Sequence, residues 1–171
     1  MGLKLKIAVG IPTYLEASSI VQAVESVLAR DSCAVEVFVS DRSENQESIR
    51  AMGDLLQEPA VKGRASKSPD GLSNFYETGR WMLEEGGLCD AYVLLAGDDW
   101  WSPELASQCL DAMKSSGADI VAPMFVWSNQ GETSEIRPLS LMHSSPFLRQ
   151  LSMVLHGIEA ERGRGPRVSH R

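Results

Sequence analysis

Residues Ile7–Leu28, IAVGIPTYLEASSIVQAVESVL, combine the pattern of a strand with that of a helix. The first five, Ile7–Ile11, are apolar and are closed by Pro12, which is typical of a short buried strand. After a polar loop, apolar residues recur at helical spacing, and Ser18 or Ser19 precedes them as a candidate N-cap. A buried strand followed closely by an amphipathic helix is the repeating unit of an α/β fold.

The rest of the chain repeats this alternation. The further strands expected are Val35–Ser40, Val61–Ala65, Tyr92–Ala96 and Ile120–Trp127, and the further helices are Gln46–Leu56, Ser73–Glu85, Ser102–Ser116 and Ser145–Gly157. The polar segment Ser128–Arg137 is expected to form a loop. Alternation of this kind predicts a mainly parallel sheet with helices on both faces.

Length and composition are those of one packed domain. The chain has 171 residues, 43% of them hydrophobic and 23% charged, which excludes disorder and fibrous repeats. Its net charge of −7 disfavours nucleic acid as a partner, because phosphate contacts need a basic face. We expect a single domain over residues 1–158 and a flexible tail over residues 159–171.

The sequence also gives indications of compartment. No apolar run approaches the roughly 20 residues that span a bilayer, and the N-terminus lacks the longer apolar centre of a signal peptide. The three cysteines are widely spaced and odd in number, as expected of reduced thiols. These features predict a cytoplasmic protein without a transmembrane segment.

Distinctive residues follow three of the expected strands, namely Pro12-Thr13-Tyr14, Asp41 and Asp98-Asp99. Ligands of open α/β sheets bind beyond the carboxyl ends of the strands. The adjacent carboxylates of Asp98 and Asp99 repel each other unless a cation or hydrogen-bond donors hold them, and Mg²⁺ takes one or two carboxylates together with substrate phosphates. A polar turn before a helix is the alternative interpretation of this pair.

Two neighbouring features also have two interpretations each. Asp41 could accept a hydrogen bond from a nucleotide base, or it could form an Asx-turn or a helix cap. Trp100 and Trp101 could stack on a sugar or pack in the core, and we expect one of them in each place.

Four segments resemble the family 2 glycosyltransferases of the GT-A fold, and they occur in the family's order between about Lys4 and Val126. They are KIAVGIPTYLEASSIVQAVESVLAR (Lys6–Arg30), VFVSDRSEN (Val37–Asn45), GLSNFYETGRW (Gly71–Trp81) and AYVLLAGDDWWSPELASQCLDAM (Ala91–Met113). The resemblance implies a Rossmann-like GT-A three-layer α/β/α sandwich with a mainly parallel sheet.

The resemblance also implies roles for individual residues. Asp98 and Asp99 would be catalytic as the DxD-type motif, with Asp99 binding Mn²⁺ or Mg²⁺ and Asp98 binding the ribose or the metal shell. The donor would be a nucleotide-diphosphate sugar, commonly a uridine diphosphate sugar. Its pocket would be formed by Pro12, Thr13, Tyr14, Glu16, Asp41, Asn74 and Asp98, with Asp41 at the base.

The chain departs from the family pattern at several places. Leu15 stands where the family often has Asn, Ser40 replaces the first acid of an acidic pair, and Arg42 takes a place often held by Gly or Asn. The family's general base, which deprotonates a hydroxyl acceptor, has only Glu132 and Glu135 as candidates here.

The resulting expectation is a metal-dependent inverting glycosyltransferase domain. The alternative is a non-catalytic nucleotide-sugar-binding or assembly module without the acceptor half. A phosphotransfer protein of receiver or phosphatase type is disfavoured, because those folds place key acids after the first strand. A homodimer that buries Phe147, Leu151 and Leu155 is a further expectation.

Overall fold

The computed structural model describes residues 5–29, 33–102, 104–117, 126–129 and 132–135. The chain divides into two compact units, Met1–Val121 and Ala122–Arg171, and each is described by itself. The expected helix Ser145–Gly157, the dimer face on it and the tail lie outside the described residues. The single domain over residues 1–158 therefore stays a prediction.

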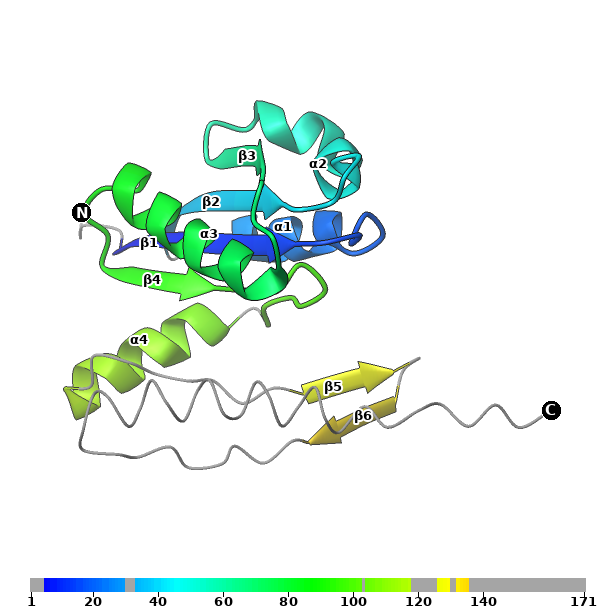
Figure 1. The fold of residues 1–171 in the computed structure, drawn as a ribbon. Coiled ribbons are helices and arrows are strands. Elements are labelled where there is room, and N and C mark those ends of the chain that lie inside the picture. Colours follow the sequence, from blue (N-terminus) through cyan, green and yellow to red (C-terminus); the bar gives the residue numbers. More distant parts are fainter. Residues whose placement is uncertain (1–4, 30–32, 103, 118–125, 130–131, 136–171) are drawn as a thin grey trace. The chain divides into compact units, whose positions relative to one another are not determined.

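The first unit contains a four-stranded parallel sheet in the order β3-β2-β1-β4 (Figure 1). Its strands are β1 (Leu5–Thr13), β2 (Cys33–Asp41), β3 (Val61–Ala65) and β4 (Ala91–Leu94). β1 continues through Pro12, which the sequence pattern had placed beyond the strand. β4 pairs with β1 only as far as Gly10, so Pro12 lies where this flank of β1 has no neighbouring strand and a missing N–H breaks no pairing.

Four α-helices of the first unit are described: α1 (Ile20–Leu28), α2 (Glu47–Met52), α3 (Gly71–Glu85) and α4 (Leu105–Ser116). The helix expected over Gln46–Leu56 is divided at Gly53, whose φ of 48° lies outside the helical region, and it continues as the 3₁₀ helix η1 (Gly53–Gln57). α3 begins two residues earlier than expected, because the carboxylate of Asp70 accepts a hydrogen bond from the Ser73 amide and caps the helix.

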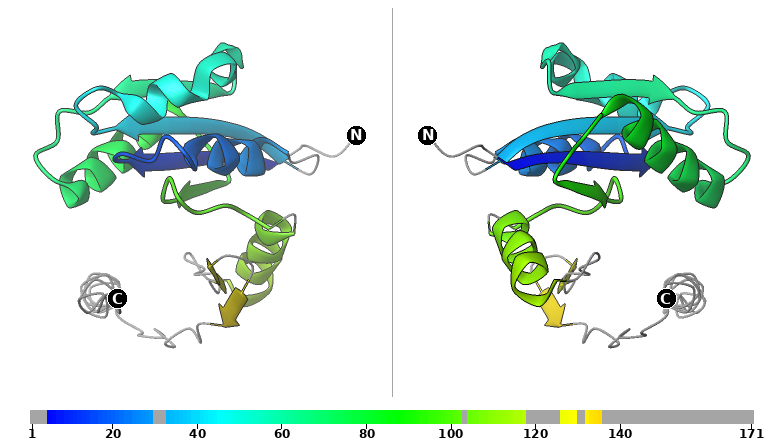
Figure 2. Two further views of the ribbon diagram at one scale, coloured as in Figure 1. Left: turned by 90° about the vertical axis from the view of Figure 1, so that its right-hand side faces the viewer. Right: turned by 90° about the vertical axis from the view of Figure 1, so that its left-hand side faces the viewer.

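The helices cover both faces of the sheet, as the alternating pattern predicts (Figure 2). On one face, buried residues of α1 and α2 form a hydrophobic cluster with β1 and β2, and this cluster also includes Ala106 and Leu110 of α4. On the other face, Trp81 and Met82 of α3 pack against Ala8 and Phe38, and the Phe38 and Trp81 rings meet edge to face at 5.1 Å. The result is the expected three-layer α/β/α sandwich.

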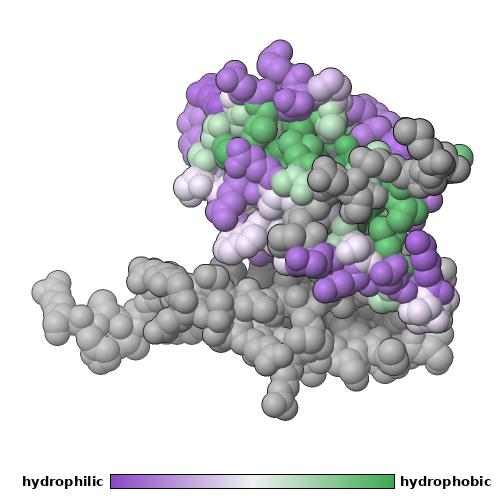
Figure 3. All heavy atoms as spheres, turned by 180° about the vertical axis from the view of Figure 1, so that it is seen from behind, coloured by the Kyte–Doolittle hydropathy of each residue, from purple (hydrophilic) through white to green (hydrophobic). Residues whose placement is uncertain are grey.

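Apolar side chains also reach the surface of the side opposite to that seen in Figure 1, where hydrophilic residues surround them (Figure 3).

The two tryptophans after the acidic pair have different environments. Trp101 is 6% exposed and belongs to the hydrophobic cluster around α1, which confirms the expectation that one of them packs in the core, whereas Trp100 is half exposed. Within the described part of the chain, no helix has the length and apolar character needed to cross a bilayer.

The described part of the second unit is an antiparallel pair of strands, β5 (Val126–Asn129) and β6 (Glu132–Glu135). The expected strand Ile120–Trp127 is described only from Val126, where β5 begins. The loop predicted over Ser128–Arg137 is wrong where it overlaps these strands, and both candidate bases, Glu132 and Glu135, lie in β6. Strand pairing uses backbone hydrogen bonds, so a run of polar side chains does not prevent it.

Candidate functional site

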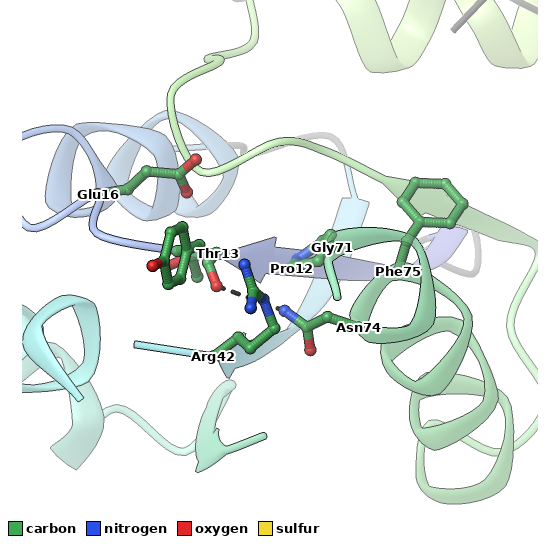
Figure 4. Close-up of a pocket in the computed structure, with 8 residues that line it drawn as sticks. Pro12, Thr13, Glu16, Arg42, Gly71, Asn74 and Phe75 are labelled. Atoms are coloured by element: carbon green, nitrogen blue, oxygen red, sulfur yellow. Dashed lines mark hydrogen bonds between the residues drawn. The ribbon is translucent and has the colours of Figure 1, made fainter. Parts of the chain in front are cut away.

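A pocket of about 170 Å³ opens where β1 and β2 end and α3 begins (Figure 4). The last residues of the two strands, Thr13 and Asp41, are paired in register, so the loops that follow them leave the sheet side by side. The pocket brings together five of the predicted site residues and adds three others. The predicted ones are Pro12, Thr13, Tyr14, Glu16 and Asn74, and the added ones are Arg42, Gly71 and Phe75.

Asn74 connects the elements around the pocket. Its side-chain amide donates to the backbone oxygens of Ser40 at 2.9 Å and Thr13 at 3.4 Å, and its Oδ1 accepts from Ser40 Oγ at 2.9 Å. The residue is only 2% exposed. Asn74 therefore holds α3 against the ends of β1 and β2, and its polar atoms are engaged with the protein.

Asp41 is completely buried and does not line the pocket. Its carboxylate accepts four hydrogen bonds, from the amide and hydroxyl of Ser43 and from the amides of Ser48 and Ile49 at the start of α2. These contacts are those of the turn-and-cap alternative raised from the sequence. A contact between Asp41 and a base stays a prediction.

The two serines held by Asp41 in turn hold the loop after β1. Ser43 Oγ accepts from the Leu15 amide at 2.8 Å, and Ser48 Oγ accepts from the Glu16 amide at 3.3 Å. Leu15 has a φ of 58°, which lies in the left-handed region that Asn tolerates better than Leu. The Asn that the family often has at this position therefore suits the backbone conformation better than the Leu of this chain. Asp41 thus orders both loops that border the pocket.

Arg42 was noted in the sequence only as a departure, and the structure places it in the pocket wall. Its guanidinium carbon lies 4.0 Å from the centre of the Tyr14 ring, a cation–π contact. Its Nε is buried and has no hydrogen-bond partner among the described residues. The one sequence signal for Arg42 as a pocket residue was its position directly after the second strand, because residues at the ends of parallel strands border the ligand cleft of α/β folds.

Glu16 connects the pocket to the Gly97-Asp98-Asp99 loop. A Cβ atom on Gly97 would overlap with Glu16 Oε2, so the absence of a side chain at Gly97 allows the carboxyl group to pack against the backbone there. Glu16 Oε2 is buried and has no hydrogen-bond partner in the part of the chain that the structure describes. Burial raises the pKa of Glu16 to about 7, and the charge of Asp98 adds to the shift, followed by smaller effects of Asp41 and Asp99.

Burial and neighbouring charge also act on Asp99. Burial raises the pKa of Asp99, and the adjacent Asp98 raises it further. The described residues contain no group of three His, Cys, Asp or Glu side chains arranged as a metal site. One or two carboxylates are sufficient for Mg²⁺ or Mn²⁺ when phosphate oxygens complete the coordination, so these acids fit such an ion.

Comparisons with known proteins identify the fold and the family of this chain. None of the curated proteins matches the sequence significantly. Among solved structures, the chain is similar to Staphylococcus aureus TarS 1-349, with a TM-score of 0.54 and 16% identity over 67% of this chain and 34% of that one. TarS 1-349 in complex with UDP-GlcNAc gives a TM-score of 0.51 and 16% identity over 67% of this chain and 33% of that one.

These two structures share the GT-A fold with this chain, which spans about a third of their length. The model of the family described as glycosyl transferase family 2 matches residues 8–162. Since that match covers most of the sequence, this chain belongs to glycosyltransferase family 2.

Proposed function

We propose that the pocket at the ends of β1 and β2 binds the nucleotide of a nucleotide-diphosphate sugar, and that the chain acts in metal-dependent, inverting glycosyl transfer to a hydroxyl acceptor. A uridine diphosphate sugar is the first candidate donor, because the related TarS structure is a complex with UDP-GlcNAc. The pocket of about 170 Å³ suits one part of such a donor, since pockets that hold whole drug-sized ligands have volumes of roughly 300–1,000 Å³.

The observation that carries the proposal is the contact between Glu16 and Gly97. It joins the pocket, where a nucleoside fits, to the loop that bears Asp98 and Asp99, where a diphosphate and its cation fit. The raised pKa values of Glu16 and Asp99 support the same arrangement, because they reflect burial first and then the nearby charge of Asp98, and a bound cation would compensate both effects.

Within this proposal the residues have separate tasks. Asp99 holds Mn²⁺ or Mg²⁺, and Asp98 contacts the ribose or completes the metal shell. Pro12, Thr13 and Tyr14 border the nucleoside, and Asn74 keeps the pocket in shape. When bound, the cation neutralises charge that develops on the leaving diphosphate.

The proposal is tested by calorimetry with uridine diphosphate and Mn²⁺ on the wild type and on Asp99→Ala. The variant should bind at least tenfold more weakly, and the wild type should lose a similar amount of affinity when Mn²⁺ is chelated. Asp111→Ala, which removes an exposed acid from α4, is the matched control and should bind like the wild type. Equal binding by the Asp99→Ala variant and the wild type would refute the metal assignment.

A non-catalytic nucleotide-sugar-binding module is the second candidate. It is favoured by one observation, namely that every described residue lining the pocket lies between Pro12 and Phe75, so the part of the donor that the pocket holds contacts only this early part of the chain. Hydrolysis or transfer of a donor sugar above background, abolished by Asp98→Ala or Asp99→Ala, would exclude this second candidate.

A further inference from the structure

The polar groups around the pocket are unequally available to a ligand. The hydroxyl of Thr13 donates to Ser48 Oγ, and both ends of the Asn74 amide are bound to the protein. Asp41 is buried with four hydrogen bonds. Two charged side chains, Glu16 and Arg42, then remain in the pocket wall to meet a ligand.

These two groups belong to opposite flanks of β1. Glu16 packs against Gly97, in the loop after β4, whereas Arg42 directly follows β2. In the sheet order β3-β2-β1-β4, the strands β2 and β4 lie on the two sides of β1. In the proposed binding mode the diphosphate lies beside Asp98 and Asp99, after β4. Arg42 follows β2 on the other side of β1, so it lies at the opposite end of the ligand, which is the end that carries the base.

Among the described residues, the guanidinium of Arg42 has contacts that do not use its N–H groups. In the cation–π contact, the positive charge of the guanidinium is attracted to the face of the Tyr14 ring, and this attraction fixes the position of the guanidinium. None of the salt bridges among the described residues involves Arg42, and its buried Nε has no hydrogen-bond partner there. Nε itself is covered by protein, so the terminal N–H groups of the guanidinium, which donate to none of the described residues, are the donors that a ligand in the pocket meets.

From these contacts we propose that Arg42 reads the nucleotide base, and that it does so as a donor to a ring carbonyl oxygen. This inference rests on the proposed function. Arginine has no acceptor, so it favours bases with a carbonyl oxygen at the reading edge, such as uracil and guanine, and it disfavours adenine, which has none. Arg42 is thus a residue that determines specificity for the base. Asp41 does not share this role, because its carboxylate is hydrogen-bonded to the protein.

The test is calorimetry of the full chain with UDP, GDP and ADP, each with Mn²⁺, on the wild type, Arg42→Ala and Arg42→Lys. The wild type should bind UDP or GDP more tightly than ADP, and the preferred one of the two identifies the base. Arg42→Ala should weaken that nucleotide roughly 10- to 100-fold and leave ADP unchanged. Arg42→Lys should restore little, because lysine lacks the planar fork of donors.

Arg50→Ala, which removes an exposed arginine from α2, controls for net charge and should bind like the wild type. An equal loss for all three nucleotides in Arg42→Ala, with recovery in Arg42→Lys, would show a phosphate contact and overturn the inference. Equal wild-type affinities for UDP, GDP and ADP, or unchanged binding in Arg42→Ala, would also overturn it while the proposed function stands. Absence of all nucleotide binding would overturn both.

Discussion

Replacement of Asp41 by Asn is expected to destabilise the fold rather than only weaken a ligand contact. The carboxylate is completely buried, and each of its oxygens accepts two hydrogen bonds. The Asn side chain keeps one oxygen as an acceptor. Its amide group would face either the N–H groups of Ser48 and Ile49, which both lose their acceptor, or the N–H and O–H of Ser43, of which at least the N–H loses its acceptor.

The size of the effect follows from these contacts. If the remaining oxygen keeps the bonds from Ser43, the amides of Ser48 and Ile49, now at 2.9 and 3.2 Å from the carboxylate, lose their partner. A hydrogen bond to a charged group contributes about 1.5–3 kcal/mol, but opening of the loop lets water satisfy part of the loss. We expect a loss of about 3 kcal/mol, or a fall in melting temperature of roughly 6–12 °C for a chain of this length.

Urea denaturation followed by far-ultraviolet circular dichroism measures this loss, and Asp54→Asn, an exposed acid in η1, is the matched control. The control should change the free energy of unfolding by less than about 0.5 kcal/mol. Unchanged stability of Asp41→Asn together with lost uridine diphosphate binding would refute this reasoning. That result would instead show that the carboxylate contacts the base.

Glu16→Gln should stabilise the metal-free protein increasingly as the pH rises. The raised pKa means that the folded state retains a proton between about pH 4.5 and 7 that the unfolded state has lost, so wild-type stability falls over this window. Gln stays neutral, and thermal unfolding in chelator should show a gain of about 1–2 kcal/mol above pH 7 and little below pH 5. Gly97→Ala should cost about 1–3 kcal/mol and weaken nucleotide binding, because its Cβ would overlap with Glu16 Oε2 and lie 3.1 Å from Thr13 Cβ. Gly79→Ala is its control in the same assays, since that Cβ has its nearest neighbour at an ordinary 3.6 Å, and it should be neutral or stabilising.

Each of these two expectations has a clear contrary result. A pH-independent difference between Glu16→Gln and the wild type would mean that the carboxyl group is solvated rather than buried beside Asp98. Full stability and full nucleotide affinity in Gly97→Ala would mean that the loop bearing the acidic pair does not approach the end of β1.

The sequence indicated the acidic pair and the first loop as candidate site residues because their positions follow from strand ends. Pro12, Thr13 and Tyr14 come directly after an apolar run, and the parallel order of the sheet brings such residues to one edge. Arg42 had the same kind of position, but an isolated arginine after a strand is more often solvated than part of a site. Its contact with Tyr14 becomes visible only when the ends of β1 and β2 are placed side by side.

In the first unit, local patterns were sufficient to identify the order of strands and α-helices, whereas the strand β6 lies where a loop was expected. The bounds of β3, Val61–Ala65, are those predicted from the sequence. Such agreement is possible because apolar residues, prolines and glycines influence the backbone conformation of only a few neighbouring residues. The partners of the polar side chains depend on contacts between residues that are far apart in the chain. Asp41 turned inward to Ser48 and Glu16 packed against Gly97 because parallel pairing brought the ends of β1, β2 and β4 together, and no local pattern states which partner a carboxylate will meet there.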